Sequence, residues 1–169
     1  AMVEAIANVT DLPAQVKWPN DIVLRGKKLG GMLTELGARG ERLDYVVVGL
    51  GLNVNLDTAS LTETMTPPTS LSEELGVSAS RLDLLMAWLT RVEVHYMRLR
   101  AGWSPRVAWR DCLATLGQAV RIGAHEEVIE GVAEDVDDDG ALLVRVASGN
   151  LRQVLVGDVT LRGQITRYE

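Results

Sequence analysis

The sequence predicts an α+β protein with a separate, small β-rich domain at its C-terminal end. Residues 14–53 hold three short strand-like runs and one continuous apolar run. Residues 82–99 instead repeat apolar side chains at helical spacing, which predicts a long amphipathic helix. After Gly117 the chain changes to short β-rich runs separated by tight turns, a pattern typical of a small barrel or open sheet.

Composition and charge narrow the class of protein. The 169 residues leave room for one ordinary domain, or for a medium and a small one. With 47% hydrophobic and 24% charged residues the chain resembles a soluble globular protein, and a net charge of −6 argues against a broad nucleic-acid-binding face. No apolar run approaches the roughly 20 residues of a membrane span. The single cysteine, Cys112, excludes an intramolecular disulfide and fits a reducing cytoplasm, where we expect the protein.

The first residues read as the interior of an amphipathic helix. Met2, Ala5, Ile6 and Val9 would share one face of that helix. Because the chain opens inside a helix, we expect it to be a fragment of a longer protein.

Four strands are expected in the first half of the chain. They cover residues 14–18, 22–24, 28–36 and 45–53. Pro19 lacks an amide donor and ends the first strand, while Asn20 and Asp21 favour a turn. The last strand contains a Val-Val-Val-Gly-Leu-Gly-Leu run, which is typical of a strand buried on both faces.

Helices are expected in the middle of the chain, followed by the β-rich part. A short helix begins at Ser70, and the stripe of leucine and methionine over 82–99 should form core. A further helix begins after Ser104-Pro105 and continues to Gly117, with Cys112 on its buried face. Later strands are expected over 118–122, 127–136, 141–147 and 151–161. The predicted domains are therefore 1–116 and 117–169.

Two polar motifs in the first half carry the chemistry. Lys17-Trp-Pro-Asn-Asp21 is followed, seven residues past Asp21, by Lys28, which opens Lys28-Leu-Gly-Gly31, so lysines, a carboxylate, an amide and paired glycines gather within fifteen residues. A site that handles a phosphate anion and a small carboxylic acid needs these groups. Trp18 is expected to pack in a core rather than stack on a ligand.

Other motifs are weaker. Gly49-Leu-Gly51 lacks the third glycine of a dinucleotide fingerprint and leads into a loop rather than a helix. The acidic run from Asp135 to Gly140 fits the first six positions of a calcium loop, but the twelfth would be Val146 rather than glutamate. We therefore expect a solvated turn there.

The ordered set of motifs resembles the biotin–protein ligase family, the biotin–[acetyl-CoA-carboxylase] ligases. The resemblance covers nearly the whole chain, in order. It rests on the two lysine motifs and on these further segments: Leu33-Thr-Glu35, Val48–Asn55, Pro68–Leu71, Asp139–Leu143 and Gly157–Arg162. It implies part of a mixed-sheet, class II synthetase-like ligase domain, followed by a small SH3-like β-barrel.

The resemblance also implies an activity, in which biotin and ATP give biotinyl-5′-adenylate and a carrier-domain lysine then receives biotin. Lys28 aligns with the lysine that contacts biotin's carboxylate and the α-phosphate. Such a stabiliser is typically worth roughly 3–4 kcal/mol of transition-state energy. Asp21 aligns with a catalytic aspartate, whose role is holding Mg²⁺ on the phosphates or orienting the reacting groups.

The same resemblance assigns the remaining site residues. It places ATP contacts on Asn20, Gly51, Asn53 and Lys17. The Asn53 amide can present both a donor and an acceptor to the edge of adenine. For Lys17, the alternative is a structural role at the surface. Gly30 and Gly31, with Lys28, fall on the biotin side, because glycine lets backbone approach a ligand closely.

The family's upstream half, with its Ser-Thr-Asn-type segment and Gly-Arg-Gly-Arg loop, is not among these residues. We therefore expect little or no activity from the chain alone. The alternatives are a non-catalytic fragment that binds nucleotide or carrier, and a related lipoate-type acyl ligase. The expected partners are biotin, ATP and the biotin carboxyl carrier domain of a carboxylase, with no membrane or nucleic acid. A homodimer formed through exposed strand edges is plausible.

Overall fold

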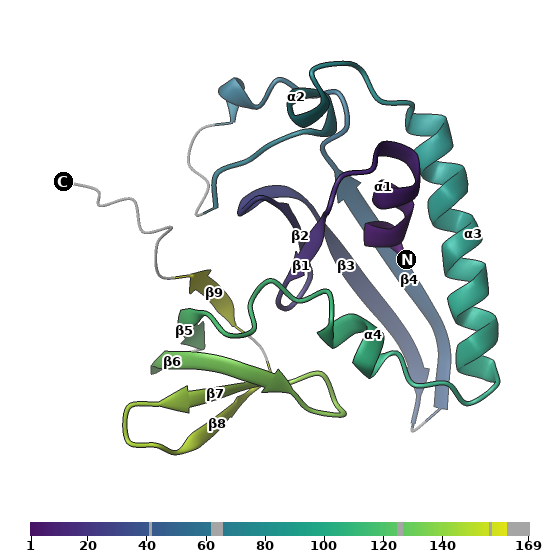
Figure 1. Cartoon of the computed structure of the whole chain (residues 1–169). Coiled ribbons are helices and arrows are strands. Elements are labelled where there is room, and N and C mark those ends of the chain that lie inside the picture. The colour runs from purple at the N-terminus through teal and green to yellow at the C-terminus, as the bar shows by residue number, and fades with distance from the viewer. Residues whose placement is uncertain (41, 62–65, 125–126, 156, 162–169) are drawn as a thin grey trace.

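Two antiparallel β-sheets, each with its own hydrophobic core, organise the protein (Figure 1). The computed structural model describes residues 1–40, 42–61, 66–124, 127–155 and 157–161. Helices α1 (Met2–Thr10) and α3 (Arg81–Arg100) lie beside the first sheet, and the second sheet follows α4 (Arg106–Arg110) in the chain. This arrangement confirms the α+β class.

The first sheet is built from three consecutive hairpins and has the order β1-β2-β3-β4. Its strands are β1 (Gln15–Lys17), β2 (Asp21–Leu24), β3 (Lys27–Arg39) and β4 (Arg42–Leu52). Arg25 and Gly26 join β2 to β3 with φ angles of 51° and 78°, the positive values that a tight two-residue hairpin requires. Every strand pair is antiparallel, and the parallel contacts are isolated bridges, Val16 with Leu113 and Lys28 with Pro68.

The core of the first sheet lies beneath the N-terminal helix. Helix α1 (Met2–Thr10) buries Met2, Ala5 and Ile6, as its spacing predicts, and packs against α3 (Arg81–Arg100). Short helix α2 (Leu71–Leu75) buries Leu71 in the same core and has Ser70 as its N-cap, with Glu73 completing a capping box. A single 3₁₀ turn, η1 (Thr58–Ser60), precedes it.

The second sheet has five strands in the order β8-β7-β6-β5-β9. The strands are β5 (Ala119–Ala124), β6 (Glu127–Val136), β7 (Leu142–Val146), β8 (Leu151–Val154) and β9 (Asp158–Leu161). Its core also takes in residues that precede position 117, namely Trp18, Leu113 and the partly buried Val16, Trp109 and Leu116. The second core is therefore assembled from both ends of the chain, and the predicted domain boundary at 117 stays a prediction.

Three expectations about secondary structure were wrong in detail. Helix α4 spans only Arg106–Arg110 rather than continuing to Gly117. The chain must leave the helix because Val16 exchanges backbone hydrogen bonds of 2.8 Å with Cys112 and Ala114, which requires an extended backbone there. The expected strand over 151–161 is divided into β8 and β9, and β3 extends further, to Arg39.

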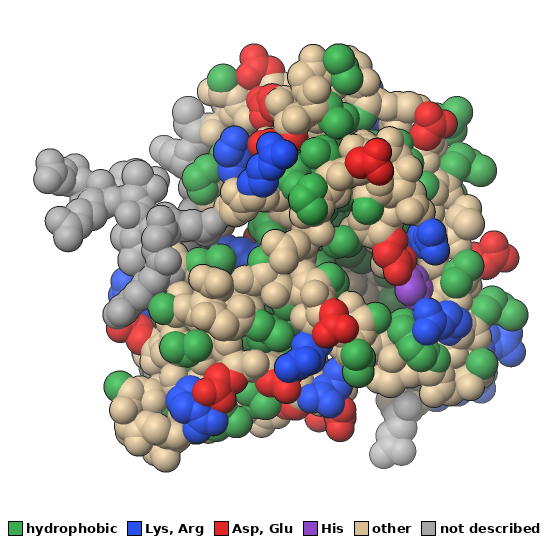
Figure 2. All heavy atoms as spheres, in the orientation of Figure 1, with side chains coloured by type: hydrophobic (Ala, Val, Ile, Leu, Met, Phe, Trp, Pro, Cys, Tyr) green, Lys and Arg blue, Asp and Glu red, His purple; other side chains and the backbone are tan. Residues whose placement is uncertain are grey.

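The apolar stripe of α3 is not core, contrary to expectation. Leu84 is buried and Ala87 and Trp88 pack partly against the first core. The stripe itself is exposed, including Leu82, Leu85, Met86, Leu89, Val92, Tyr96 and Leu99. Hydrophobic side chains appear along the side of the molecule where α3 runs (Figure 2). Among the described helices and strands α1 packs most extensively on this helix, and it leaves the stripe uncovered.

Strand β4 was expected to be buried on both faces, and this too was wrong. Val46 and Val48 are 46% and 43% exposed on one face, and Tyr45 and Val47 are 61% and 51% exposed on the other. A continuous apolar run indicates that a strand favours burial, but burial also requires a packing partner. The described residues supply no such partner for the part of the β3–β4 ribbon that contains Tyr45 to Val48. None of the helices in the described ranges is both long and apolar enough to cross a membrane.

We expect this uncovered apolar surface to bind the dye ANS. Replacing Val46 and Val48 together by lysine should reduce the fluorescence enhancement, because it puts two charges on the face of the β3–β4 ribbon that also carries exposed Leu36. Val77→Lys is the control, since Val77 is also exposed (66%) but lies outside strands and helices. Equal enhancement in the double variant and in wild type would contradict this account of the surface.

Candidate functional site

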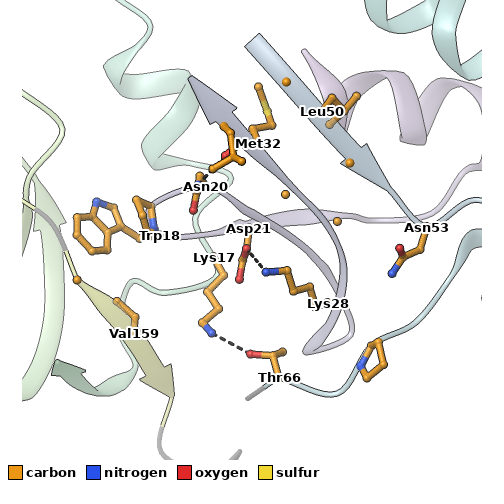
Figure 3. A pocket seen from close by; sticks show the side chains of 18 of the residues that line it. Lys17, Trp18, Asn20, Asp21, Lys28, Met32, Leu50, Asn53, Thr66 and Val159 are labelled. Atoms are coloured by element: carbon orange, nitrogen blue, oxygen red, sulfur yellow. Dashed lines mark hydrogen bonds and ion pairs between the residues drawn. The ribbon is translucent and has the colours of Figure 1, made fainter. Parts of the chain in front are cut away.

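A wide cleft of about 1210 Å³ lies against the first sheet, and the second sheet closes one side of it (Figure 3). The second sheet contributes Gly123 and Val159, and the segment before β9 contributes Gly157. All residues predicted for the site line this cleft: Lys17, Asn20, Asp21, Lys28, Gly30, Gly31, Gly51 and Asn53. Tertiary structure has thus brought the two lysine motifs and the end of β4 together.

An ion pair between Asp21 and Lys28 lies in the cleft. The Lys28 Nζ is 2.6 Å from the Asp21 Oδ1, and the two side chains are 41% and 22% exposed. Asp21 is the first residue of β2 and Lys28 the second of β3, so the tight Arg25-Gly26 hairpin sets their separation. The ammonium remains open to an anion entering the cleft.

The neighbouring lysine, Lys27, serves a different purpose. Successive strand residues point to opposite faces, and the Lys27 Nζ lies 3.2 Å from Glu74, which Arg25 also contacts at 2.9 Å. Burial alone would raise the pKa of Glu74, but a hydrogen bond from Thr69 and the Lys27 ammonium outweigh it and lower that pKa. Lys27 therefore holds α2 to the β2–β3 hairpin and does not line the cleft.

Gly30 and Gly31 line the cleft, and a side chain would be excluded at the first position and crowded at the second. A Cβ on Gly30 would lie 2.2 Å from the backbone oxygen of Gly51. A Cβ on Gly31 would lie 3.2 Å from the Asp21 Oδ1 and 4.0 Å from the Lys28 Cε. Gly30 thus permits close pairing of β3 with β4, while Gly31 leaves space for the ion pair.

The two predicted asparagines both hold backbone. Asn20 donates from Nδ2 to the Met32 carbonyl at 2.6 Å, and its own carbonyl accepts from the Met32 amide at 3.0 Å. Asn53 donates from Nδ2 to the Thr69 carbonyl at 3.0 Å. Within the described chain the Asn53 side chain makes no other hydrogen bond, so its oxygen and second amide hydrogen can serve a ligand.

Lys17 is buried, which excludes the surface alternative. Its side chain is part of a residue only 6% exposed, and its Nζ donates to the Thr66 hydroxyl at 2.9 Å. Figure 3 shows the Lys17 side chain extending toward Thr66, which lies in the segment that precedes α2. A lysine ammonium in this position adds positive charge to the cleft wall, next to the Asp21–Lys28 pair.

Some features of the cleft were not predicted from the sequence. Thr66 and Gly123 belong to none of the matching segments, and Gly157 and Val159 lie in one that was given no role in the site, because only the fold brings these residues to the two lysine motifs. The expectation that Trp18 packs in a core is confirmed, since it is 1% exposed. Arg162, at the end of one matching segment, lies outside the described residues.

Two weaker candidates from the sequence, Cys112 and the acidic turn at Asp135–Gly140, make structural contacts. Burial raises the pKa of the Cys112 thiol, and the sulfur donates to the Trp109 carbonyl at 3.0 Å, as suits a packed rather than a nucleophilic cysteine. The described residues contain no cluster of three or more histidine, cysteine, aspartate or glutamate side chains that could hold a metal ion. In the acidic turn, Asp137 instead accepts hydrogen bonds from the amides of Asp139 and Ala141.

Comparison with known proteins places these features in a family. The profile described as the Biotin/lipoate A/B protein ligase family matches residues 1–53, and the profile described as the Biotin protein ligase C terminal domain matches residues 115–162. The chain belongs to the biotin protein ligase family. The first match ends at Asn53, so it contains every predicted site residue.

Relatives of this chain include ligases from several bacteria. The biotin–[acetyl-CoA-carboxylase] ligase of Paracoccus denitrificans is 34% identical over 152 residues, which are 83% of this chain and 59% of that protein. The ligase of the same name from Mycobacterium tuberculosis is 32% identical over 94% of this chain and 58% of its own length. The bifunctional ligase/repressor BirA of Bacillus subtilis is 29% identical over 95% and 50%. The chain therefore spans about half the length of these relatives.

Solved ligase structures share the fold. A biotin protein ligase from Aquifex aeolicus superposes with a TM-score of 0.80 at 27% identity, covering 95% of this chain and 70% of that one. The Aquifex aeolicus ligase in complex with biotin and ATP gives a TM-score of 0.76 at 26% identity, covering 95% and 67%.

We expect Gly30→Ala to reduce the free energy of unfolding by about 1–3 kcal/mol, because the added methyl overlaps the Gly51 carbonyl. Gly49→Ala is the matched control, since a Cβ there meets only the Leu33 carbonyl, at 3.8 Å. Urea titrations of both variants measure the difference. Equal stability of the two variants would contradict the close approach of β3 and β4 at Gly30.

Proposed function

We propose that the chain forms part of an enzyme that uses ATP to convert biotin to biotinyl-5′-adenylate and then transfers biotin to a lysine of a carrier domain. The observation that carries the proposal is the Asp21–Lys28 pair, 2.6 Å apart in a cleft lined by Gly30 and Gly31. The likeness to the Aquifex aeolicus ligase, which binds biotin and ATP, supports it.

The chemistry fits the charges in the cleft. In the first step a biotin carboxylate oxygen attacks the α-phosphorus of ATP, and pyrophosphate leaves. In the second, the carrier lysine attacks the acyl carbon of the adenylate, loses a proton, and AMP leaves. The first step brings two anions together, so a cation at their meeting point stabilises the transition state. Lys28 supplies that cation, and buried Lys17 adds charge on the phosphate side.

Asp21 suits a Mg²⁺ ion that arrives on the phosphates of ATP. Magnesium is commonly held by one or two carboxylates together with substrate phosphates, and Asp21 provides one carboxylate in the cleft. When bound, the ion would neutralise phosphate charge. Apart from this, Asp21 orients the Lys28 ammonium, Asn20 holds the turn to Met32, and Asn53 and Gly51 face the nucleotide.

The partners follow from the reaction. The acceptor is a biotin carboxyl carrier domain of a carboxylase, and the protein acts in the cytoplasm. We also propose a catalytic part over 1–116 and a C-terminal part over 117–169. A homodimer formed through the exposed β4 strand is compatible with its apolar surface.

Two alternatives remain testable. A chain that binds ATP and biotin but never exchanges pyrophosphate would be a binding fragment. A chain that activates lipoate or octanoate in preference to biotin would be a lipoate-type acyl ligase, which the breadth of the first matching family profile keeps open.

Lys28→Ala should reduce biotin-dependent exchange of pyrophosphate into ATP by about 100- to 1,000-fold, because it removes the charge at the meeting point of the two anions. The exchange is measured in the protein expressed from its complete reading frame. Lys27→Ala is the matched control, since Lys27 pairs with Glu74 outside the cleft. Unchanged exchange in Lys28→Ala would exclude the role assigned to this lysine.

Asn53→Ala should raise the KM for ATP several-fold more than the KM for biotin, because the amide faces the nucleotide side of the cleft. Asn55→Ala is the control: the Asn55 side chain bonds both the amide and the carbonyl of Ala79, and it does not line the cleft. Asn53→Ala also loses the hydrogen bond to Thr69, so equal changes in both KM values would indicate a general loosening of the 66–70 segment instead.

A further inference from the structure

Trp18 lies inside the first lysine motif but packs in the core of the second sheet. Its neighbours Lys17 and Pro19 line the cleft, and Trp18 does too, but its indole points toward the strands of the second sheet (Figure 3). Trp18 is 1% exposed and belongs to the cluster formed by Val120, Ile122 and other residues of that sheet. The five-residue motif thus joins the cleft to the core of the second sheet.

Two hydrogen bonds fix Trp18 to the C-terminal part of the chain. The indole Nε1 donates to the Gly140 carbonyl at 3.0 Å, and the backbone amide donates to the Thr115 hydroxyl at 2.9 Å. Thr115 is completely buried. These bonds span 122 and 97 residues of sequence, so they form only when the second sheet is seated against the motif.

The Gly140 acceptor is itself held rigidly. Gly140 has a φ of 84°, a value that side chains rarely allow, and it closes a turn whose amides bind the Asp137 carboxylate. Arg110 contacts Asp135 at 2.6 Å just before this turn, and Arg106 donates to the Val136 carbonyl. The indole therefore bonds to a well-anchored carbonyl rather than to a loose loop.

We propose that Trp18 is a positioning residue through which the second sheet sets the geometry of the Asp21–Lys28 pair. Asn20 and Asp21 both lie within three residues of the anchored Trp18. Asn20 is hydrogen-bonded to Met32, and Asp21 pairs with Lys28. Release of the indole would let the turn that carries Asp21 shift relative to β3. The expected effect on kcat rests on the proposed function, whereas the expected shift of the turn that carries Asp21 does not.

The test compares Trp18→Phe with Trp109→Phe. Phenylalanine retains an apolar ring but cannot donate to Gly140. Trp109 is partly buried against the same core, with its ring beside Gly140, and within the described chain its indole nitrogen makes no hydrogen bond. Its variant therefore controls for lost packing near Gly140 without the loss of a hydrogen bond. Measurements are made at a temperature at which both variants are folded by circular dichroism.

Hydrogen exchange is the first readout, measured in this chain. The Met32 amide, which donates to the Asn20 carbonyl, should exchange at least tenfold faster in Trp18→Phe than in Trp109→Phe. Equal exchange in the two variants would overturn the proposal, because a purely structural role loosens the core without selecting this turn.

Pyrophosphate exchange in the protein from the complete reading frame is the second readout. We expect kcat to fall about tenfold in Trp18→Phe, with the KM for biotin within twofold of wild type, while Trp109→Phe stays near wild type. A wild-type kcat in Trp18→Phe, or an equal loss in both variants, would overturn the proposal. Lys28→Ala is assayed in parallel. If wild type shows no biotin-dependent exchange, the proposed function fails, and if Lys28→Ala retains it, only the role assigned to Lys28 fails. In either case the hydrogen exchange still decides the role of Trp18.

Discussion

The candidate site depends on the register of β3 between its two neighbours. Gly31 lies opposite Asp21 of β2 on one side and Gly51 of β4 on the other, and Gly30 approaches the Gly51 carbonyl too closely for any side chain. A slip of one residue would turn every side chain of the strand to the other face. Lys28 would then leave the cleft, and Lys27 would take its place beside Asp21.

This register explains why the site residues could be predicted from the sequence while their surroundings could not. Asp21 and Lys28 lie in one hairpin, so a local motif is sufficient to bring them together. Strand β4 and the stripe of α3 were predicted to be buried because they are apolar, but burial also requires a partner, which an apolar pattern does not identify. Helix α4 was predicted to be too long for a similar reason. It ends because Leu113 pairs with Val16, almost a hundred residues earlier in the chain.

Two adjacent residues of the first motif serve different parts of the fold. Lys17 extends toward Thr66 and the cleft, while Trp18 enters the second core and bonds to Gly140. Alternation of side chains along an extended backbone makes this division possible. A reader of the sequence sees one polar motif with a tryptophan in it, since nothing local indicates that the tryptophan belongs to a core formed a hundred residues later.

The two lysines of the cleft differ in how firmly their ammonium groups are held: Lys17 is fixed in place, whereas Lys28 can exchange one anionic partner for another. Lys17 is 6% exposed and hydrogen-bonded to a buried threonine, so its ammonium has little freedom to move. Lys28 is 41% exposed, and its pair with Asp21 is of the solvent-accessible kind that is typically worth about 0–1 kcal/mol. An incoming carboxylate or phosphate can therefore replace Asp21 as the partner of Lys28 at small cost. In a chain of net charge −6, this exchange lets the cleft attract an anion locally without leaving an uncompensated cation when the anion departs.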